Sequence, residues 1–118
     1  MPPDPRTFLP LKPVDLQLLL ALAERELHGY ALVQAIADGT DGLVVLDPGN
    51  LYRVIKRLLA DGLIDEADRR PAADLGEERR RYYTLTALGS RALAAEIARL
   101  QSLVRSPAVR AFARGWST

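Results

Sequence analysis

The stretch from Asp47 to Ile64 is the feature that most constrains the fold of this chain. It opens with a turn-forming pair, Pro48-Gly49, and closes at Gly62, a residue type favoured immediately after a helix. Between these limits, apolar residues recur at the i, i+4, i+7 spacing of one helical face, namely Leu51, Ile55 and Leu58. The spacing predicts a short amphipathic helix with one buried stripe.

The opposite face of this helix is basic. It carries three cations, Arg53, Lys56 and Arg57, and no acidic residue. An apolar inner stripe combined with an outward basic face is typical of a nucleic-acid reader. The same pattern also fits a solvated surface helix, so the rest of the chain has to distinguish the two interpretations.

Charge is divided unevenly along the 118 residues, although the net charge is only +1. Residues 1–47 hold three Lys or Arg against seven Asp or Glu, whereas residues 48–118 hold thirteen against eight. The positive charge therefore begins where the basic helix begins. Such an asymmetry indicates a polyanion as a partner, although the excess is modest.

Several classes of protein are excluded or disfavoured by the composition. The length fits one domain, no run of eighteen apolar residues could span a membrane, and the proline-rich start lacks the apolar region of a signal peptide. The absence of cysteine excludes disulfides and thiolate metal sites and favours the cytoplasm. With His28 as the only histidine and no catalytic motif, we expect a non-enzyme without a metal or cofactor. His28 itself is expected to cap or pack the second helix.

The order of the expected elements indicates a fold. The pattern predicts a proline-rich arm at 1–13, helices at 14–26 and 30–37, a short strand at 43–46, the basic helix, a hairpin at 63–85 with its tip at 69–79, a helix capped by Thr86 at 87–105, and a tail at 106–118 that is either a short helix or a loose end. This is the order of a winged helix-turn-helix domain over residues 14–86, mainly α with a small β-hairpin wing. The apolar residues of the arm either pack onto something, such as a partner subunit, or belong to a disordered tail.

In such a fold the third helix enters the major groove and the wing reaches the flanking backbone or minor groove. Both places are basic here, and the candidate DNA-binding residues are Asn50, Tyr52, Arg53, Lys56, Arg57, Arg79, Arg80 and Arg81. Asn50, Arg53 and Arg57 have side chains that pair with base edges, although Arg57 could instead contact only phosphate. For Lys56 we expect a phosphate contact, and Tyr52 either bonds a phosphate or only packs.

The helix at 87–105 carries a seam of coiled-coil type. Its apolar residues are spaced 4, 3 and 4 apart, at Leu93, Ile97, Leu100 and Val104. The seam either completes the core of its own domain or pairs with a second copy. We expect a homodimer, because the three preceding helices already enclose one another.

Three segments of the chain resemble the PadR family of transcriptional regulators. They are Leu27-His28-Gly29-Tyr30, then Pro48-Gly49-Asn50-Leu51-Tyr52 ahead of Asp61-Gly62-Leu63-Ile64, and finally Arg81-Tyr82-Tyr83-Thr84-Leu85-Thr86 with Gly89. Each is weak alone, but together they span about residues 14 to 93 in a specific order. The resemblance implies a dimeric, ligand-responsive repressor of the short type, with the C-terminal helix at the dimer interface.

Two positions depart from the family pattern, since the family often has a small residue or proline at Arg53 and threonine at Asn50. Trp116 lies well past the dimer helix, so an aromatic drug site is not carried over. The expected function is a sequence-specific repressor that binds a double-stranded DNA operator as a homodimer, with a small-molecule effector at the dimer interface. The alternative is a winged-helix interaction module that dimerises without reading DNA.

Overall fold

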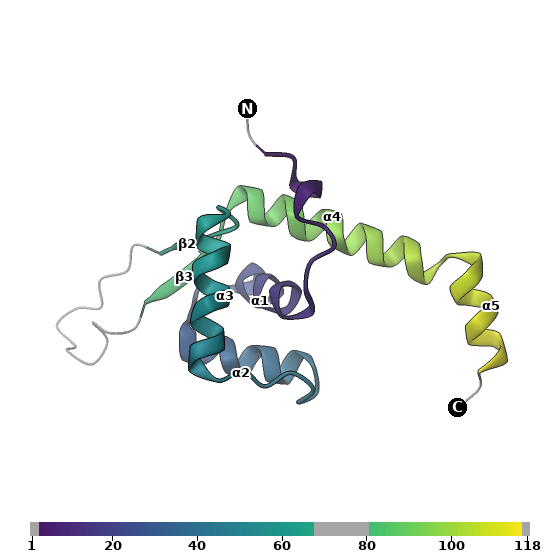
Figure 1. Cartoon of the computed structure of the whole chain (residues 1–118), viewed down its shortest axis with the longest axis horizontal. Helices are drawn as coiled ribbons and strands as arrows, with labels where there is room; N and C mark the ends of the chain where they lie inside the picture. The colour runs from purple at the N-terminus through teal and green to yellow at the C-terminus, as the bar shows by residue number, and fades with distance from the viewer. Residues whose placement is uncertain (1–2, 68–80, 117–118) are drawn as a thin grey trace.

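The computed structural model describes residues 3–67 and 81–116. Its elements are, in order, the 3₁₀ helix η1 (Pro5–Phe8), α1 (Pro13–Glu24), β1 (Leu27–His28), α2 (Gly29–Gly39), α3 (Pro48–Ala60), β2 (Ile64–Glu66), β3 (Tyr82–Leu85), α4 (Ala87–Val104) and α5 (Pro107–Gly115). Helices α1 to α3 form a compact head, and α4 runs along it and continues well beyond it to α5 (Figure 1). Apart from the position of the first strand, this is the winged helix-turn-helix order expected from the sequence.

A single core holds the head together. The buried apolar side chains come from the arm, all four of α1 to α4, and the sheet: Leu11, Leu18, Leu19, Leu22, Leu27, Leu32, Ile36, Leu51, Ile55, Leu58, Leu63, Ile64, Tyr83, Ala92 and Leu93. The stripe expected on the third helix is confirmed, because Leu51, Ile55 and Leu58 are all nearly inaccessible to solvent. Removal of this apolar surface from water is the main force that fixes α3 on the domain.

The sheet corrects one prediction. Leu43–Leu46 was expected to be a strand, but the structure gives it no regular structure, with Leu43 and Val45 exposed and Val44 and Leu46 packed against the core. The strand that completes the sheet beside the wing strands β2 and β3 is β1 instead. It pairs antiparallel with β3, with Leu27 opposite Tyr83, and the strand order is β1-β3-β2. A β-branched apolar run favours an extended chain, but a strand also needs an edge to pair with, and β1 already pairs with the edge of β3 that β2 leaves free.

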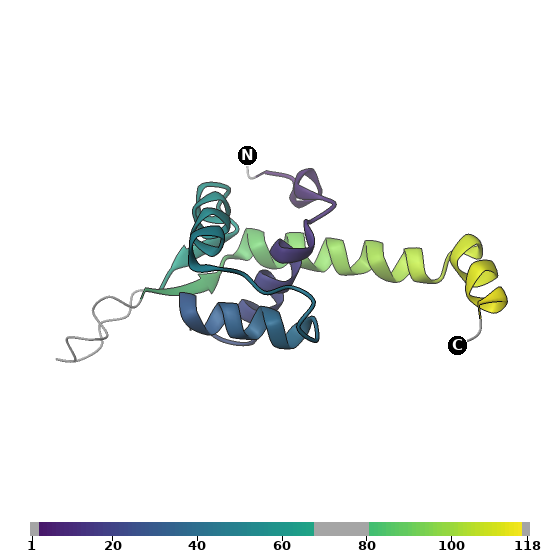
Figure 2. The same ribbon diagram turned by 60° about the horizontal axis from the view of Figure 1, so that its bottom comes forward.

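The N-terminal arm packs on its own domain. Asp4 caps η1, Phe8 and Leu9 lie against the core, and Leu11 is buried within it. In both ribbon views η1 lies beside α4 (Figures 1 and 2). In its described part the arm is therefore ordered within the same chain, and it needs no partner subunit to cover its apolar residues.

Helix α4 begins at the expected cap and extends away from the head. The Thr86 hydroxyl accepts a hydrogen bond from the N–H of Gly89 at 2.9 Å, which confirms Thr86 as the N-cap. The rod of α4 projects away from the head, as Figure 2 shows. The tail is a helix, α5, capped by Ser106. Among the helices in the described ranges, none is long and apolar enough to cross a lipid bilayer.

Candidate nucleic-acid interface

Helix α3 is bounded by defined caps at both ends. Asp47 is the N-cap and accepts a hydrogen bond from the N–H of Asn50 at 2.9 Å. Pro48 therefore lies in the first turn of the helix, whereas the sequence predicted that it would belong to a turn before the helix. At the other end Gly62 has φ +77°, and the N–H of Leu63 bonds the carbonyl of Leu58 at 3.0 Å. This is the Schellman ending that a glycine at this position permits. The caps fix both the length of α3 and the direction of its exposed face.

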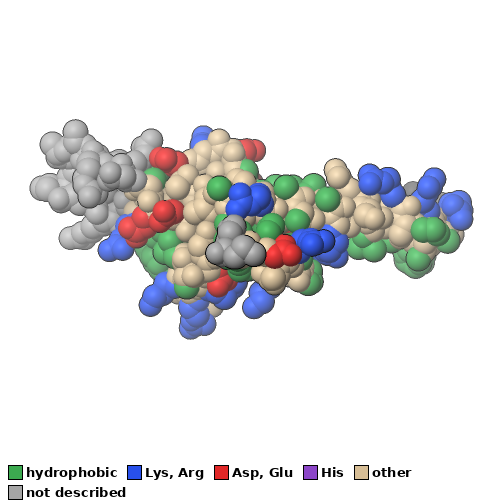
Figure 3. All heavy atoms as spheres, turned by 90° about the horizontal axis from the view of Figure 1, so that it is seen from above, with side chains coloured by type: hydrophobic (Ala, Val, Ile, Leu, Met, Phe, Trp, Pro, Cys, Tyr) green, Lys and Arg blue, Asp and Glu red, His purple; other side chains and the backbone are tan. Residues whose placement is uncertain are grey.

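Four of the candidate residues lie on the solvent side of α3. Asn50, Tyr52, Arg53 and Lys56 are exposed, opposite the buried stripe. Lys and Arg side chains project from the edge of the head that α3 forms, and others lie along α4 and α5 (Figure 3). The exposed side of α3 therefore offers cations, an amide and a phenol to a partner.

Asn50 and Arg53 are held together by a short chain of hydrogen bonds. The Nδ2 of Asn50 donates to Oδ2 of Asp47 at 2.9 Å, and an amino group of Arg53 donates to Oδ1 of Asn50 at 3.3 Å. The two side chains are thereby oriented side by side before any ligand arrives. Because these bonds are exposed, they can be exchanged for hydrogen bonds to base edges at little cost.

Arg57 is placed differently from the expectation of an outward cation. Its two amino groups donate to the two carboxylate oxygens of Asp15 on α1, at 2.8 and 2.9 Å. Asp15 is buried and Arg57 is partly exposed, with 6% and 40% of their side chains accessible. The hydrogen bonds that Arg57 donates to Asp15 raise the pKa of its guanidinium, so it remains charged. Asp15 was not among the expected site residues, although it is the acidic residue in the first turn of a strongly apolar helix.

The wing is described only at its base. In the described part, Arg81, which immediately precedes β3, forms an ion pair with Glu66 of β2 at 3.0 Å, and both side chains are exposed. An exposed pair of this kind contributes little to stability, so Arg81 can exchange Glu66 for a phosphate. Arg79, Arg80 and the hairpin tip lie outside the described residues. Strands β2 and β3 lie beside α3 in both ribbon views (Figures 1 and 2).

The seam expected on α4 is divided between two environments. Leu93 is 6% exposed and belongs to the core of its own head, so it offers a second copy little surface. Ile97 packs partly against that core, Leu100 is half-buried, and Val104 is 63% exposed. An open groove of about 280 Å³ runs along this end of α4, lined by Ile97, Leu100, Gln101, Val104 and Arg105.

The described ranges contain no cluster of three or more His, Cys, Asp or Glu arranged to hold a metal ion. His28 caps α2 instead, because its Nδ1 accepts a hydrogen bond from the N–H of Ala31 at 3.3 Å, and its ring meets Tyr82 edge-on. This confirms the capping role expected for the single histidine.

The model of the transcriptional regulator PadR-like family matches residues 18–95, about two thirds of the chain. The chain belongs to the PadR-like family. The match includes all of α2 and α3, both wing strands and the first half of α4. A search of curated protein sequences finds no match to this PadR-like chain.

Solved structures similar to the chain share its fold at low identity. RosR of H. salinarum superposes with a TM-score of 0.66 at 20% identity, covering 92% of this chain and 91% of RosR. A PadR-like transcription factor from Bacteroides fragilis superposes with a TM-score of 0.63 at 21% identity, covering 76% of this chain and 82% of that protein. PadR of Bacillus subtilis in complex with operator DNA superposes with a TM-score of 0.60 at 22% identity, covering 82% of this chain but 50% of that protein.

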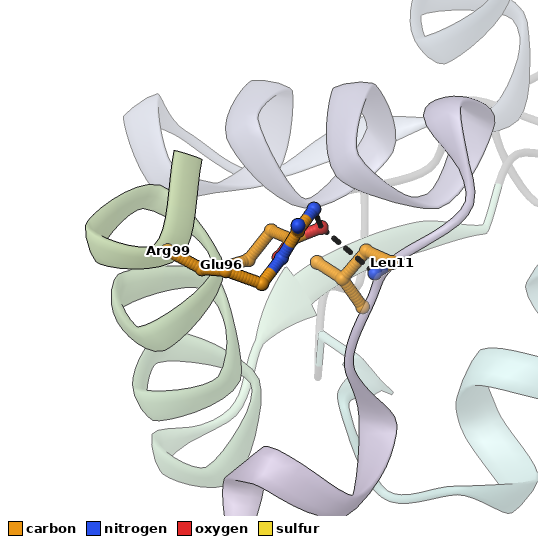
Figure 4. Close-up of polar contacts among 3 residues, drawn as sticks. All are labelled: Leu11, Glu96 and Arg99. Carbon is orange, nitrogen blue, oxygen red and sulfur yellow. Dashed lines mark hydrogen bonds and ion pairs between the residues drawn. The ribbon is translucent and has the colours of Figure 1, made fainter. Parts of the chain in front are cut away.

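A buried glutamate joins the arm of this PadR-like chain to α4. Glu96 is 1% exposed, and its carboxylate accepts hydrogen bonds from the N–H of Leu11 at 2.8 Å and from Nε of Arg99 at 2.6 Å (Figure 4). The bond from Arg99 lowers the pKa of Glu96, burial opposes that shift, and the bond from Leu11 adds to it. The Glu96 carboxylate thus bonds the N-terminal arm to α4, the helix that projects from the head.

This contact predicts a specific acid sensitivity. The pKa of Glu96 is lower in the folded protein than its ordinary value of 4.5, so the ionised carboxylate stabilises the fold above pH 4.5. This stabilisation is lost as the pH falls through the pKa that Glu96 has in the folded protein. We expect Glu96→Gln to cost about 1–3 kcal/mol at pH 7 and to flatten the fall of stability below pH 4.5. Urea denaturation between pH 7 and pH 3 measures both. Glu66→Gln, which removes an exposed partner, is the control, and an acid slope equally steep in Glu96→Gln and wild type contradicts the assignment.

Proposed function

We propose that this protein is a DNA-binding transcriptional repressor that acts as a homodimer on a near-palindromic operator. The observation that carries the proposal is the exposed face of α3, where Asn50, Arg53 and Lys56 stand outward on a helix without a single acidic residue. The PadR-like family membership supports the same function. So does the similar fold of B. subtilis PadR, whose structure is a complex with operator DNA.

In this proposal, Asn50 and Arg53 read base edges in the major groove, because an amide pairs with adenine and a guanidinium with guanine in a bidentate manner. Lys56 and Tyr52 bind phosphates on either side, and Arg81 with Arg79 and Arg80 contacts the flanking backbone from the wing. Phosphate contacts set the position of the head, and the two base-reading side chains set the sequence.

The far end of α4 is the proposed dimer interface. Val104 and Leu103 expose apolar surface there, next to the groove lined by Ile97 and Leu100, and a second copy would remove this surface from water. A small-molecule effector bound in the groove would change the angle between the two α4 helices and hence the distance between the two heads. Repression is then relieved when the recognition helices no longer fit adjacent grooves about 34 Å apart.

Selection of bound sites from random duplex DNA tests the proposal. We expect an inverted repeat with half-sites one helical turn apart, and binding whose logarithm falls with log salt at a slope of about −5 if six phosphates are contacted. Enrichment of a single, non-repeated half-site contradicts the dimer. The absence of any salt-dependent DNA binding contradicts DNA recognition and favours the alternative, a winged helix that only mediates protein contacts.

A further inference from the structure

The ion pair between Asp15 and Arg57 joins the first helix to the recognition helix across 42 residues of sequence. It is bidentate, with both guanidinium amino groups on both carboxylate oxygens. This planar geometry restrains the arginine more than a single contact does. Asp15 is buried and needs this partner, since an unpaired carboxylate there would carry a large desolvation penalty.

The pair changes what α3 presents to solvent. Of its three cations, Arg53 and Lys56 are exposed, whereas Arg57 is turned onto α1 and neutralised by Asp15. Yet Arg57 lies one helical turn from Arg53 and keeps 40% of its side chain accessible. If the carboxylate did not hold it, the guanidinium would be long enough and near enough to the exposed face to reach a phosphate.

We propose that Asp15 is a positioning residue for DNA recognition, which holds Arg57 away from the DNA and fixes the rotation of α3 so that Asn50 and Arg53 face the groove. The inference rests on the proposed DNA-binding function. It assigns Arg57 an anchoring role in place of base readout. It also gives Asp15 an effect on specificity, because a released cation strengthens binding to any duplex, whatever its sequence.

The main test is Asp15→Asn, which keeps the shape of the side chain and removes its charge. We expect this variant to bind an unrelated duplex more tightly and to lose about tenfold in the ratio of operator to unrelated affinity at low salt. Its salt slope should steepen by about 2 per dimer, since two released arginines each add about 0.9. A merely structural role for Asp15 would lower stability without changing the slope.

A second variant separates anchoring from readout. In Asp15→Leu with Arg57→Met, apolar side chains replace the pair, so neither charge is left buried alone. We expect its operator affinity to stay within about threefold of wild type, with the wild-type salt slope. We expect this replacement to fold, because it leaves no unpaired buried charge, and it then tests the role of Arg57 even if Asp15→Asn is unstable.

Two results overturn the inference alone: a wild-type salt slope in folded Asp15→Asn, or a loss of operator affinity in the double variant as large as that in Arg53→Ala. A wild-type protein that binds no DNA overturns the proposed function, and this inference with it. The wild-type salt titration therefore distinguishes the two failures.

Discussion

Gly89→Ala is expected to lower the free energy of unfolding by about 3 kcal/mol or more, the largest stability effect of a single methyl group that we predict. A Cβ at this position would lie 2.0 Å from the carbonyl oxygen of Leu63 and 2.8 Å from Cδ1 of Leu85. The oxygen belongs to the backbone and already accepts hydrogen bonds from the N–H and hydroxyl of Thr86. Moving it away would therefore break the junction between the wing and α4 as well.

Two other glycines provide controls in the same urea denaturation experiment. Gly115→Ala, at the end of α5, meets no atom within 4 Å and should leave stability unchanged or slightly raised. Gly39→Ala meets only the flexible side chain of Gln17, at 2.7 Å from its Oε1, so its cost should stay below about 1 kcal/mol. Equal stability of the Gly89 and Gly115 variants would disprove the close approach of α4 to Leu63.

Arg53→Ala is expected to produce the largest functional effect, a roughly thousandfold loss of operator affinity. One bidentate contact to guanine contributes about 2 kcal/mol of discrimination, and a dimer makes it twice, giving about 4 kcal/mol. Loss of Arg53 also removes the hydrogen bond of 3.3 Å to Oδ1 of Asn50, so this base-reading side chain is held only by Asp47. Because Arg53 is exposed, stability should change by less than about 0.5 kcal/mol.

The measurement is a titration of operator and of unrelated duplex by fluorescence anisotropy. Arg91→Ala, which removes an exposed arginine from α4, is the matched control and should lose little affinity for either duplex. For Arg53→Ala the affinity for unrelated DNA should fall much less than the affinity for the operator. An equal loss on both duplexes would show that Arg53 contacts phosphate only, and an unchanged operator affinity would remove it from the interface.

Much of the fold could be predicted because its signals are local. The apolar spacing of Leu51, Ile55 and Leu58 decides which face of α3 is buried, whatever it packs against. The caps at His28 and Thr86 and the positive φ of Gly62 likewise depend on residues three or four positions away. The prediction of a strand at 43–46 was wrong because strand pairing depends on an edge elsewhere in the chain.

The candidate site was predicted in part, for the same reason. Asn50, Arg53 and Lys56 are exposed because they lie opposite an apolar stripe, which the sequence alone determines. Helical periodicity could not show that Arg57 meets Asp15, 42 residues away, or that Glu96 meets Leu11, 85 residues away. Nor could it show that Leu93 is buried in the core of its own head whereas Val104 is exposed. Hydrophobic periodicity thus specifies the faces of each helix, whereas the partners of buried charges depend on how the helices pack, which only the tertiary structure decides.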